Sequence, residues 1–298
     1  MTDDGIRAVV VTYNSEHEIG GCLDALTHAS EKYRLDVTVV DNGSSDGTLR
    51  ILHEQHPSVQ VIASTNLGYA HGCNLAVREV LENGRDCKAI LILNPDATLC
   101  AGAIDQLAEV LFSAPDTGGV SPHVVERSGG ENLRLRTLMG SSMIDEPLAG
   151  HNVAVTDRLH GCCMLLRPEV FQRIGFLDEH YFLYWEELDF GLRAIASGFK
   201  LLLCSDVVVY HRCDSQERRH RIYYMWRNQF RFARNRYAAV PRLIFLSRRA
   251  LGAVKELANF IRIKRFDLVG AAMAGLWAGL RGETGKSSSR YAEPASAD

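Results

Sequence analysis

The sequence lacks the features that would assign it at once to several common classes. It contains no C-x-x-C pair, so its eight cysteines form no zinc clip, and we interpret them as buried and inert. No basic segment followed by an apolar one begins the chain, which predicts a cytoplasmic protein. The most apolar late stretch, residues 268–280, is shorter than the ~20 residues of a spanning helix, so we expect no membrane crossing.

Positive charge and several familiar catalytic motifs are also scarce. The net charge of -3 over 298 residues argues against nucleic-acid binding, because such proteins usually carry a basic excess. There is no G-x-G-x-x-G after the first strand, no H-E-x-x-H, no G-x-S-x-G and no P-loop. A dehydrogenase, a zinc protease, an esterase and a P-loop enzyme are therefore all disfavoured.

What the first hundred residues do contain is an alternation of apolar, β-branched runs with helix-like segments. This alternation predicts β-α-β units around a parallel sheet. The predicted strands are residues 7–12, 37–40, 59–62 and 89–93, and the predicted helices are 16–32, 48–56, 70–82 and 103–112. Ligands of such sheets bind beyond the carboxyl ends of the strands, where this sequence is strongly polar.

The rest of the chain is more varied. Gly, Pro and Ser punctuate residues 113–157, which predicts loops with a short hairpin. Order returns with a strand over 162–166, a helix over 168–174 and a last strand over 200–210 that ends at His211. We predict a catalytic domain over 1–213 (a nucleotide-binding half 1–100 and an acceptor-binding half 101–213), a helical extension over 214–285 and a disordered tail over 286–298.

Two acidic residues follow predicted strands. Asp41 could accept the imide N–H of a pyrimidine or a ribose hydroxyl, and we prefer this role to a helix cap, which we give to Asp46. Asp96, in Asn94-Pro95-Asp96, could cap its own loop or hold a divalent cation whose shell a diphosphate completes. His211 ends the last strand at the same edge and could be a second ligand.

A third acidic group stands among large aromatic residues. Glu186, Glu187 and Asp189 could begin a helix, where the dipole favours acids, or could supply a general base with a raised pKa. Asp189 is four residues before Arg193 and could pair with it, so we interpret Asp189 as structural. Glu187 is then the better catalytic candidate.

Taken in order, these segments resemble the family 2 glycosyltransferases of GT-A fold, and particularly their rhamnosyltransferase-like branch. The resemblance covers roughly residues 7–236 and is weaker over 120–159. It rests on VVVTYNS (9–15), VVDNGSSDG (39–47), NLGYA (66–70) with Asn74, LNPDA (93–97), FLDE (176–179) and FLYWEELD (182–189). It implies a Rossmann-like, mostly parallel sheet flanked by helices, with a C-terminal helical extension.

The resemblance also implies roles for individual residues. Glu187 would be the base, with Glu186 in support or as its replacement, although the family usually has Asp at position 187. Asp96 and His211 would bind Mg²⁺ or Mn²⁺. Residues of the nucleotide site would be Thr12, Tyr13, Glu16, Asp41, Asn66, Gly68 and Asn94, and those of the donor or acceptor pocket Asn74 and Trp185.

The implied reaction is a single displacement that moves a sugar from a dTDP- or UDP-sugar to a hydroxyl acceptor, which could be lipid-linked. The branch makes dTDP-L-rhamnose the leading donor. Two other interpretations stay open. A sugar-phosphate nucleotidyltransferase would need a basic, Gly-rich loop near the first strand, and a nucleotide-sugar-binding protein would have lost catalysis through the change at Glu187.

The late part of the chain is open to several partners. Residues 217–249 are dense in arginine with interleaved aromatics, typical of a solvated helix face, of a peripheral contact with the inner face of a membrane, or, least favoured, of a nucleic-acid surface. Residues 240–280 could bury an apolar face internally, on a membrane, or in a homodimer. Periodicity alone does not choose among these.

Overall fold

The computed structural model describes residues 5–83, 87–128, 131–136, 142–143, 148–212 and 218–292. The chain divides into two compact units, which are described one at a time. The first comprises Met1–Leu177 and Phe190–Cys213, and the second Asp178–Asp189 and Asp214–Asp298. The expected boundary at 213/214 coincides with one of these divisions, whereas the aromatic and acidic segment 178–189 joins the second unit.

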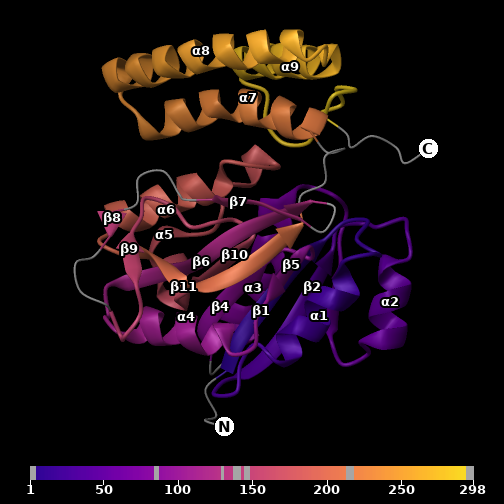
Figure 1. The fold of residues 1–298 in the computed structure, drawn as a ribbon, viewed down its shortest axis with the longest axis vertical. Helices are drawn as coiled ribbons and strands as arrows, with labels where there is room; N and C mark the ends of the chain where they lie inside the picture. Colours follow the sequence, from indigo (N-terminus) through magenta and orange to yellow (C-terminus); the bar gives the residue numbers. More distant parts are fainter. Residues whose placement is uncertain are drawn as a thin grey trace. The chain divides into compact units, whose positions relative to one another are not determined.

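The first unit begins with four parallel strands in the order β3-β2-β1-β4 (Figure 1). The register pairs Thr12 of β1 with Asp41 of β2, so the loops that follow these strands begin at one edge of the sheet. All four predicted strands are confirmed, as are the helices between them. Their bounds are β1 Gly5–Thr12, β2 Arg34–Asp41, β3 Gln60–Ala63, β4 Cys87–Leu93, α1 Ile19–Thr27, α2 Thr48–Gln55 and α3 Tyr69–Asn83.

Beyond β4 the sheet is mixed. Strand β10 runs antiparallel between β4 and β6, and β11 lies parallel to β6. The remaining elements of this unit are β5 Ala97–Leu99, β6 Thr117–Ser128, β7 Glu131–Arg136, β8 Ser142–Met143, β9 Val153–Val155, β10 Cys163–Leu166, β11 Lys200–Arg212, α4 Ala103–Phe112, α5 Pro168–Ile174 and the main part of α6 Glu186–Ala196. The predicted strands at 162–166 and 200–210 and the helix at 168–174 are therefore confirmed.

Loops with a short hairpin were expected over 113–157. A hairpin is present, because β6 pairs antiparallel with β7, but the length of β6 is the main departure from the expectation. Its glycines are packing positions and not turns. A Cβ at Gly118 would lie 2.8 Å from the side chain of Phe199, and one at Gly119 would lie 2.6 Å from Leu159. Glycine in a strand interior marks such a close approach as often as it marks a break.

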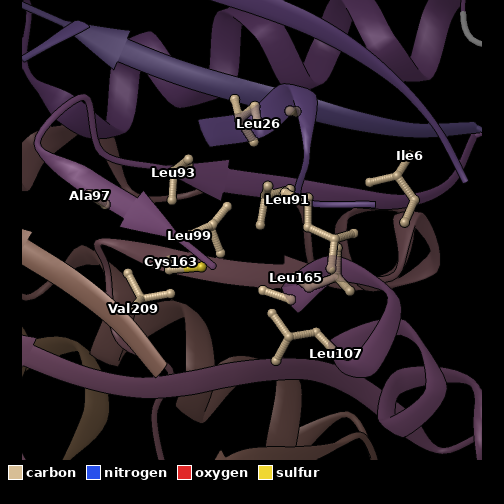
Figure 2. Close-up of a cluster of buried hydrophobic side chains, with 14 of the residues drawn as sticks. Ile6, Leu26, Leu91, Leu93, Ala97, Leu99, Leu107, Cys163, Leu165 and Val209 are labelled. Carbon is tan, nitrogen blue, oxygen red and sulfur yellow. The ribbon is translucent and has the colours of Figure 1, made fainter. Parts of the chain in front are cut away.

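The core of the first unit lies on both faces of the sheet. Because successive side chains of a strand point to opposite faces, Leu91 and Leu93 of β4 join one cluster while Ile90 and Ile92 join the other. Figure 2 shows the first cluster, where Leu91 lies near Leu165 of β10, its partner in the sheet. Burial on both faces explains why the predicted strands read as continuous apolar runs.

The second unit is built from α7 (Arg218–Arg236), α8 (Ala239–Arg262) and α9 (Phe266–Arg281), which contact one another (Figure 1). Helices α7 and α9 pack closely because glycine faces the contact. A Cβ at Gly275 would collide with the carbonyl oxygen of Tyr223, and one at Gly279 would lie 2.7 Å from that of Arg227. Within the described residues, no helix combines the length and apolarity needed to cross a membrane.

The end of the chain is ordered further than the sequence analysis expected. Ser287 bonds the hydroxyl of Tyr223 at 2.7 Å, and Ala292 is buried in the cluster that includes Phe182 and Tyr224. The expected disordered tail over 286–298 therefore differs from the structure over 286–292, where aromatic residues of α7 provide the packing surface. Residues 293–298 lie outside the described residues.

Candidate functional site

The loops after β1 and β2 are joined by reciprocal hydrogen bonds. The carboxylate of Glu16 accepts the backbone N–H of Gly47 at 2.7 Å, and the carboxylate of Asp46 accepts the backbone N–H of Glu16 at 3.1 Å. Asn14 donates its backbone N–H to the hydroxyl of Ser44 at 2.9 Å. These bonds fix the two loops of the predicted nucleotide site relative to one another.

Asp41 ends β2 and is almost fully buried. Its Oδ2 accepts the backbone N–H groups of Gly43 and Ser44, and its Oδ1 accepts the hydroxyl of Ser44. A ligand role was predicted for Asp41 and a capping role for Asp46. In the structure both carboxylates cap, since Asp46 also binds Thr48 at the start of α2. A nucleoside can reach Asp41 only through the remaining lone pairs of its oxygens.

Two buried polar atoms at this edge have no hydrogen-bond partner among the residues that the structure describes. They are Oγ1 of Thr12 and Oδ1 of Asn42. The amide nitrogen of Asn42 donates to the carbonyl oxygen of Gly68 at 3.3 Å, and Asn66 is half-buried in the same loop. Tyr13 is 41% exposed. Because an unsatisfied buried polar atom costs about 1–3 kcal/mol, these oxygens beside an exposed ring suit a polar ligand.

Asp96 and His211 lie together because of strand register. Strand β5 begins at Ala97 and pairs antiparallel with β11, so that Ala97 stands opposite His211. The backbone N–H of Arg212 also donates to the carbonyl oxygen of Asp96 at 3.0 Å. As a result Nε2 of His211 lies 3.2 Å from Oδ1 of Asp96 and 3.4 Å from Nδ2 of Asn94.

The side chains of Asn94 and Asp96 suit a divalent cation. In the described part of the chain, Oδ1 of each is buried and, despite the proximity of His211, accepts no hydrogen bond. Carboxylate and amide oxygens with one imidazole are ligands that Mg²⁺ or Mn²⁺ accepts. The described residues contain no group of three His, Cys, Asp or Glu side chains able to hold a metal. Phosphate oxygens or water would have to complete the shell.

Two further charged residues beside Asp96 were missed by the sequence analysis. The carboxylate of Glu18 accepts Nη1 of Arg212 at 2.8 Å. Burial raises the pKa of Glu18, the cation of Arg212 opposes this shift, and the negative charge of Asp96 adds to it. Arg212 directly follows His211, so its place at the end of a strand could have indicated a site residue. Glu18 lies within a predicted helix, where nothing in the sequence distinguishes it.

The segment before the acidic pair has a strained backbone. Phe182, Tyr184 and Trp185 have φ angles of 69°, 64° and 81°, although none is glycine. A non-glycine residue in this left-handed region costs on the order of 1–3 kcal/mol and persists only where surrounding contacts determine it. Strain of this kind gathers at functional sites.

Those contacts come from α7. The side-chain amide of Asn228 donates to the carbonyl oxygens of Tyr181, Leu183 and Tyr184 at 2.9, 2.8 and 3.1 Å. Arg227 donates to Tyr181 from Nη2 at 2.8 Å and to Asn228 from Nε at 2.9 Å. Both donors are buried, so water competes little for these bonds. This pair was not predicted, because Arg227 and Asn228 have no recognisable spacing to the segment that they hold.

Glu186 and Glu187 begin α6 in the second unit. Glu186 is buried, and first this burial and then the charge of Glu187 raise its pKa well above the usual 4.5. In the described structure Oε2 of Glu186 has no hydrogen-bond partner. Glu187 is half-buried. Asp189 lies 2.8 Å from Nε of Arg236, whereas the partner predicted for it was Arg193, whose guanidinium donates to the carbonyl oxygens of Ile174 and Phe176.

Trp185 and Asn74, both predicted to line a donor or acceptor pocket, make hydrogen bonds and packing contacts within the protein. Nε1 of Trp185 donates to the carbonyl oxygen of Met225 at 3.1 Å, and its ring packs 5.0 Å from that of Phe232. Asn74 is fully buried, and its amide bonds the backbone N–H and carbonyl of Leu177 at 3.1 and 2.9 Å. The polar atoms of both side chains are thus engaged by protein, and a place in a substrate pocket stays a prediction for both residues.

The arginine-rich stretch 217–249 falls mainly on α7, apart from residue 217, which lies outside the described residues. The interleaved aromatic residues of α7 do not form a surface. Tyr223, Tyr224, Trp226 and Phe232 are all buried, and Arg227 is among the largest fully buried side chains. Most of this stretch is therefore the internal helix of the second unit, which corrects the surface expected there.

The chain is similar to known glycosyltransferases over most of its length. The model of glycosyl transferase family 2 matches residues 8–175. A hexosyltransferase of low-salt glycan biosynthesis, Agl10 of Haloferax volcanii, is 26% identical over 96% of this chain and 94% of its own. An N-acetylglucosaminyl-diphospho-decaprenol L-rhamnosyltransferase of Mycobacterium tuberculosis is 27% identical over 72% of this chain and 78% of its own.

The fold is also similar to that of a solved glycosyltransferase structure. The mannosyltransferase PcManGT from Pyrobaculum calidifontis, in complex with GDP-Man and Mn²⁺, matches with a TM-score of 0.58 at 20% identity. The match covers 93% of this chain and 75% of that protein. This likeness concerns the fold alone, and it confirms the predicted GT-A class with its helix-flanked sheet.

Proposed function

Because the chain belongs to glycosyl transferase family 2, we propose that it transfers a hexose, with inversion, from a nucleoside diphosphate donor to a hydroxyl acceptor. The observation that carries this proposal is the pair Asp96 and His211 at the carboxyl edge of the sheet, beside buried oxygens that accept no hydrogen bond in the described part of the chain. The first unit also presents Tyr13 and the buried hydroxyl of Thr12. Such a surface suits a ligand that carries both a nucleoside and a diphosphate.

Asp96, His211 and Asn94 are the residues that would hold a divalent cation. When bound, Mg²⁺ or Mn²⁺ supplies positive charge that stabilises a leaving diphosphate. Arg212, which directly follows His211 and is held by the carboxylate of Glu18, adds a second positive charge beside the predicted metal site. The mannosyltransferase of similar fold was solved with GDP-Man and Mn²⁺, which supports this use of a metal.

Glu187 is proposed as the general base. It accepts the proton of the acceptor hydroxyl while that oxygen forms a bond to the anomeric carbon of the donor. The bond from this carbon to the diphosphate oxygen breaks, and its electron pair leaves with the nucleoside diphosphate. Attack opposite the leaving group inverts the configuration, and a positioned base contributes ~10²- to 10⁴-fold to such a step.

Glu186 supports this assignment by its surroundings. Burial raises the pKa of Glu186 well above its usual range, so the neutral form of this carboxyl is favoured. The half-buried Glu187 is then the carboxylate able to accept a proton. Glu186 is the alternative general base if the extra methylene of Glu187, relative to Asp, moves its carboxylate out of reach of the acceptor hydroxyl.

The names of the relatives indicate which donor and acceptor to test first. The mycobacterial relative is an L-rhamnosyltransferase named for a diphospho-decaprenol acceptor, and the haloarchaeal one is a hexosyltransferase. We therefore take dTDP-L-rhamnose as the leading donor, with UDP-hexoses next, and a lipid-linked sugar as the leading acceptor.

A panel of nucleotide sugars tests the proposal. Each is mixed with the protein with and without Mn²⁺ or Mg²⁺, and both the thermal midpoint and the slow release of nucleoside diphosphate are measured. One donor should stabilise the protein and release nucleoside diphosphate only when the metal is present. Stabilisation without any release would instead identify a binding protein, and full activity in chelator would contradict the role of Asp96 and His211.

A further inference from the structure

Exposed apolar side chains are concentrated on two helices of the second unit. In the described part of the chain, fifteen large apolar residues are strongly exposed, and eleven of them lie on α8, α9 or the turn between them. Val240 and Leu251 on α8 are each 70% exposed, and Phe266 and Trp277 on α9 are 65% and 62% exposed. Single exposed apolar residues are ordinary, but a contiguous group marks a contact surface.

The spacing places these residues in rows along the helices. On α8, Val240, Val254 and Ile261 are separated by multiples of seven residues, as are Ile244 and Leu251. Side chains at this spacing share a helix face, and the 24 residues of α8 make that face about 36 Å long. On α9, Met273, Trp277 and Leu280 follow the same helical periodicity.

The same region is strongly basic. Residues 239–281 contain six arginines and two lysines against one Glu and one Asp, a net charge of +6 in a chain whose net charge is -3. Arg248, Lys255 and Arg262 are exposed and seven residues apart, so they form a row on α8 beside the apolar ones. A row of cations next to a row of apolar side chains is the pattern of a helix that lies in a membrane interface.

We propose that the exposed face of α8 and α9 docks on an anionic lipid surface. The apolar rows would enter the boundary between headgroups and acyl chains, to a depth of ~5–10 Å, while the cations contact anionic headgroups. A second copy of the chain is a poorer partner for this face, because it would place another region of net charge +6 opposite the first. Trp277 favours the interface over the hydrocarbon core, because its ring is amphipathic.

This surface lies on α8 and α9, whose apolar face over 240–280 was expected to be buried internally, on a membrane or in a homodimer, and not on α7, where most of the arginine-rich stretch lies. It stands independently of the donor and acceptor proposed above. If the acceptor is lipid-linked, docking would keep the enzyme at the surface where that acceptor is found.

Co-sedimentation with vesicles tests the inference. The full chain is mixed with phosphatidylcholine vesicles, with or without phosphatidylglycerol, at low and high salt. We expect binding only to the anionic vesicles, weakened by salt. Equal binding to neutral vesicles, or none to either kind, would overturn the proposal.

Variants assign the binding to this face. Leu251→Glu and Val254→Glu together should weaken vesicle binding by at least about tenfold, since each places a charge where an apolar side chain would be buried. Ile195→Glu, at an exposed apolar position of the first unit, is the matched control and should bind as the wild type does. Unchanged binding by the double variant, with an unchanged thermal midpoint, would refute the assignment.

Two further readouts separate the alternatives. Sedimentation velocity tests self-association: a wild-type dimer that the double variant converts to a monomer would show that the face is a subunit contact, against the proposal. Release of nucleoside diphosphate from the donor in the absence of lipid should be the same in wild type and double variant. Loss of that activity in both would count against the proposed function but leave the vesicle result intact.

Discussion

The side-chain amide of Asn228 donates a hydrogen bond of 2.9 Å to the carbonyl oxygen of Tyr181, a residue 47 positions earlier in the chain. The same amide also bonds the carbonyl oxygens of Leu183 and Tyr184, within a segment whose backbone φ angles are positive at three non-glycine residues. Glu186 and Glu187 follow directly. The position of the acidic pair therefore depends on a side chain of α7 that takes no part in the proposed chemistry.

Replacing Asn228 with Ala should therefore affect turnover more than donor binding. The strained segment would relax, and a shift of about 1 Å at Glu187 lowers kcat by roughly 10- to 100-fold, with the KM for the donor nearly unchanged. Loss of the buried bonds should also reduce stability by about 1–3 kcal/mol. Steady-state kinetics and thermal midpoints check both effects. Asn235→Ala, at an exposed site of the same helix, is the control, and a normal kcat for Asn228→Ala would refute the positioning role.

Two substitutions distinguish the members of the acidic pair. Gln has the shape of a protonated Glu, and burial already favours the protonated form of Glu186 by raising its pKa. Glu186→Gln should therefore keep most of the wild-type turnover, while Glu187→Gln should lose ~10²- to 10⁴-fold in kcat. Transfer assays at saturating donor measure the two values. A nearly normal rate for Glu187→Gln would end its assignment as base, and loss in Glu186→Gln alone would transfer the role to that residue.

Much of the nucleotide-binding half could be predicted from sequence because its signals are local. Continuous apolar runs predicted β1, β2 and β4. Strands β1 and β2 end at the polar residues Thr12 and Asp41, and the polar Asn94 directly follows β4. Asp96 and His211 were also predictable as neighbours, since Asp96 follows β4 and His211 lies near the end of β11, at the same edge of the sheet. The pairing of β11 with the short strand β5, which brings the two side chains together, was not predicted. The sequence did not reveal that the carboxylate of Asp41 accepts the backbone N–H groups of Gly43 and Ser44 in the turn that follows it.

The features that escaped prediction depend on contacts between distant segments. Gly118 and Gly119 suggested a loop, and only the packing of Phe199 and Leu159 explains their place in β6. The hydrogen bonds of Asn74 to Leu177, a residue 103 positions later in the chain, were not predicted either. For α8 and α9, periodicity indicated an apolar face, but whether that face is covered is a property of the folded chain.

Metal binding should require Asp96 even when no sugar is transferred. Asp96→Asn removes the only carboxylate of the predicted pair, so the rise in thermal midpoint that Mn²⁺ produces together with a nucleoside diphosphate should be largely lost. The variant should bind Mn²⁺ at least about tenfold more weakly by calorimetry, in the range seen when a residue supporting a metal site is removed. Asp24→Asn, at an exposed site on α1, serves as the control. Equal metal binding by Asp96→Asn and wild type would exclude this site.

A buried histidine on α7 should make the protein less stable in mild acid. Burial first, and then the cations of Arg221 and Arg219, lower the pKa of His220 from 6.5 to about 4. The unfolded chain therefore takes up a proton between these values while the folded chain does not. The stabilising contribution is complete above pH 6.5 and falls by roughly 3 kcal/mol as the pH drops to about 4. Urea unfolding at about pH 7 and about pH 5 should show a smaller loss in His220→Leu than in wild type or in His53→Gln, which alters an exposed histidine on α2. Equal losses in all three proteins would mean that His220 is protonated in the folded state.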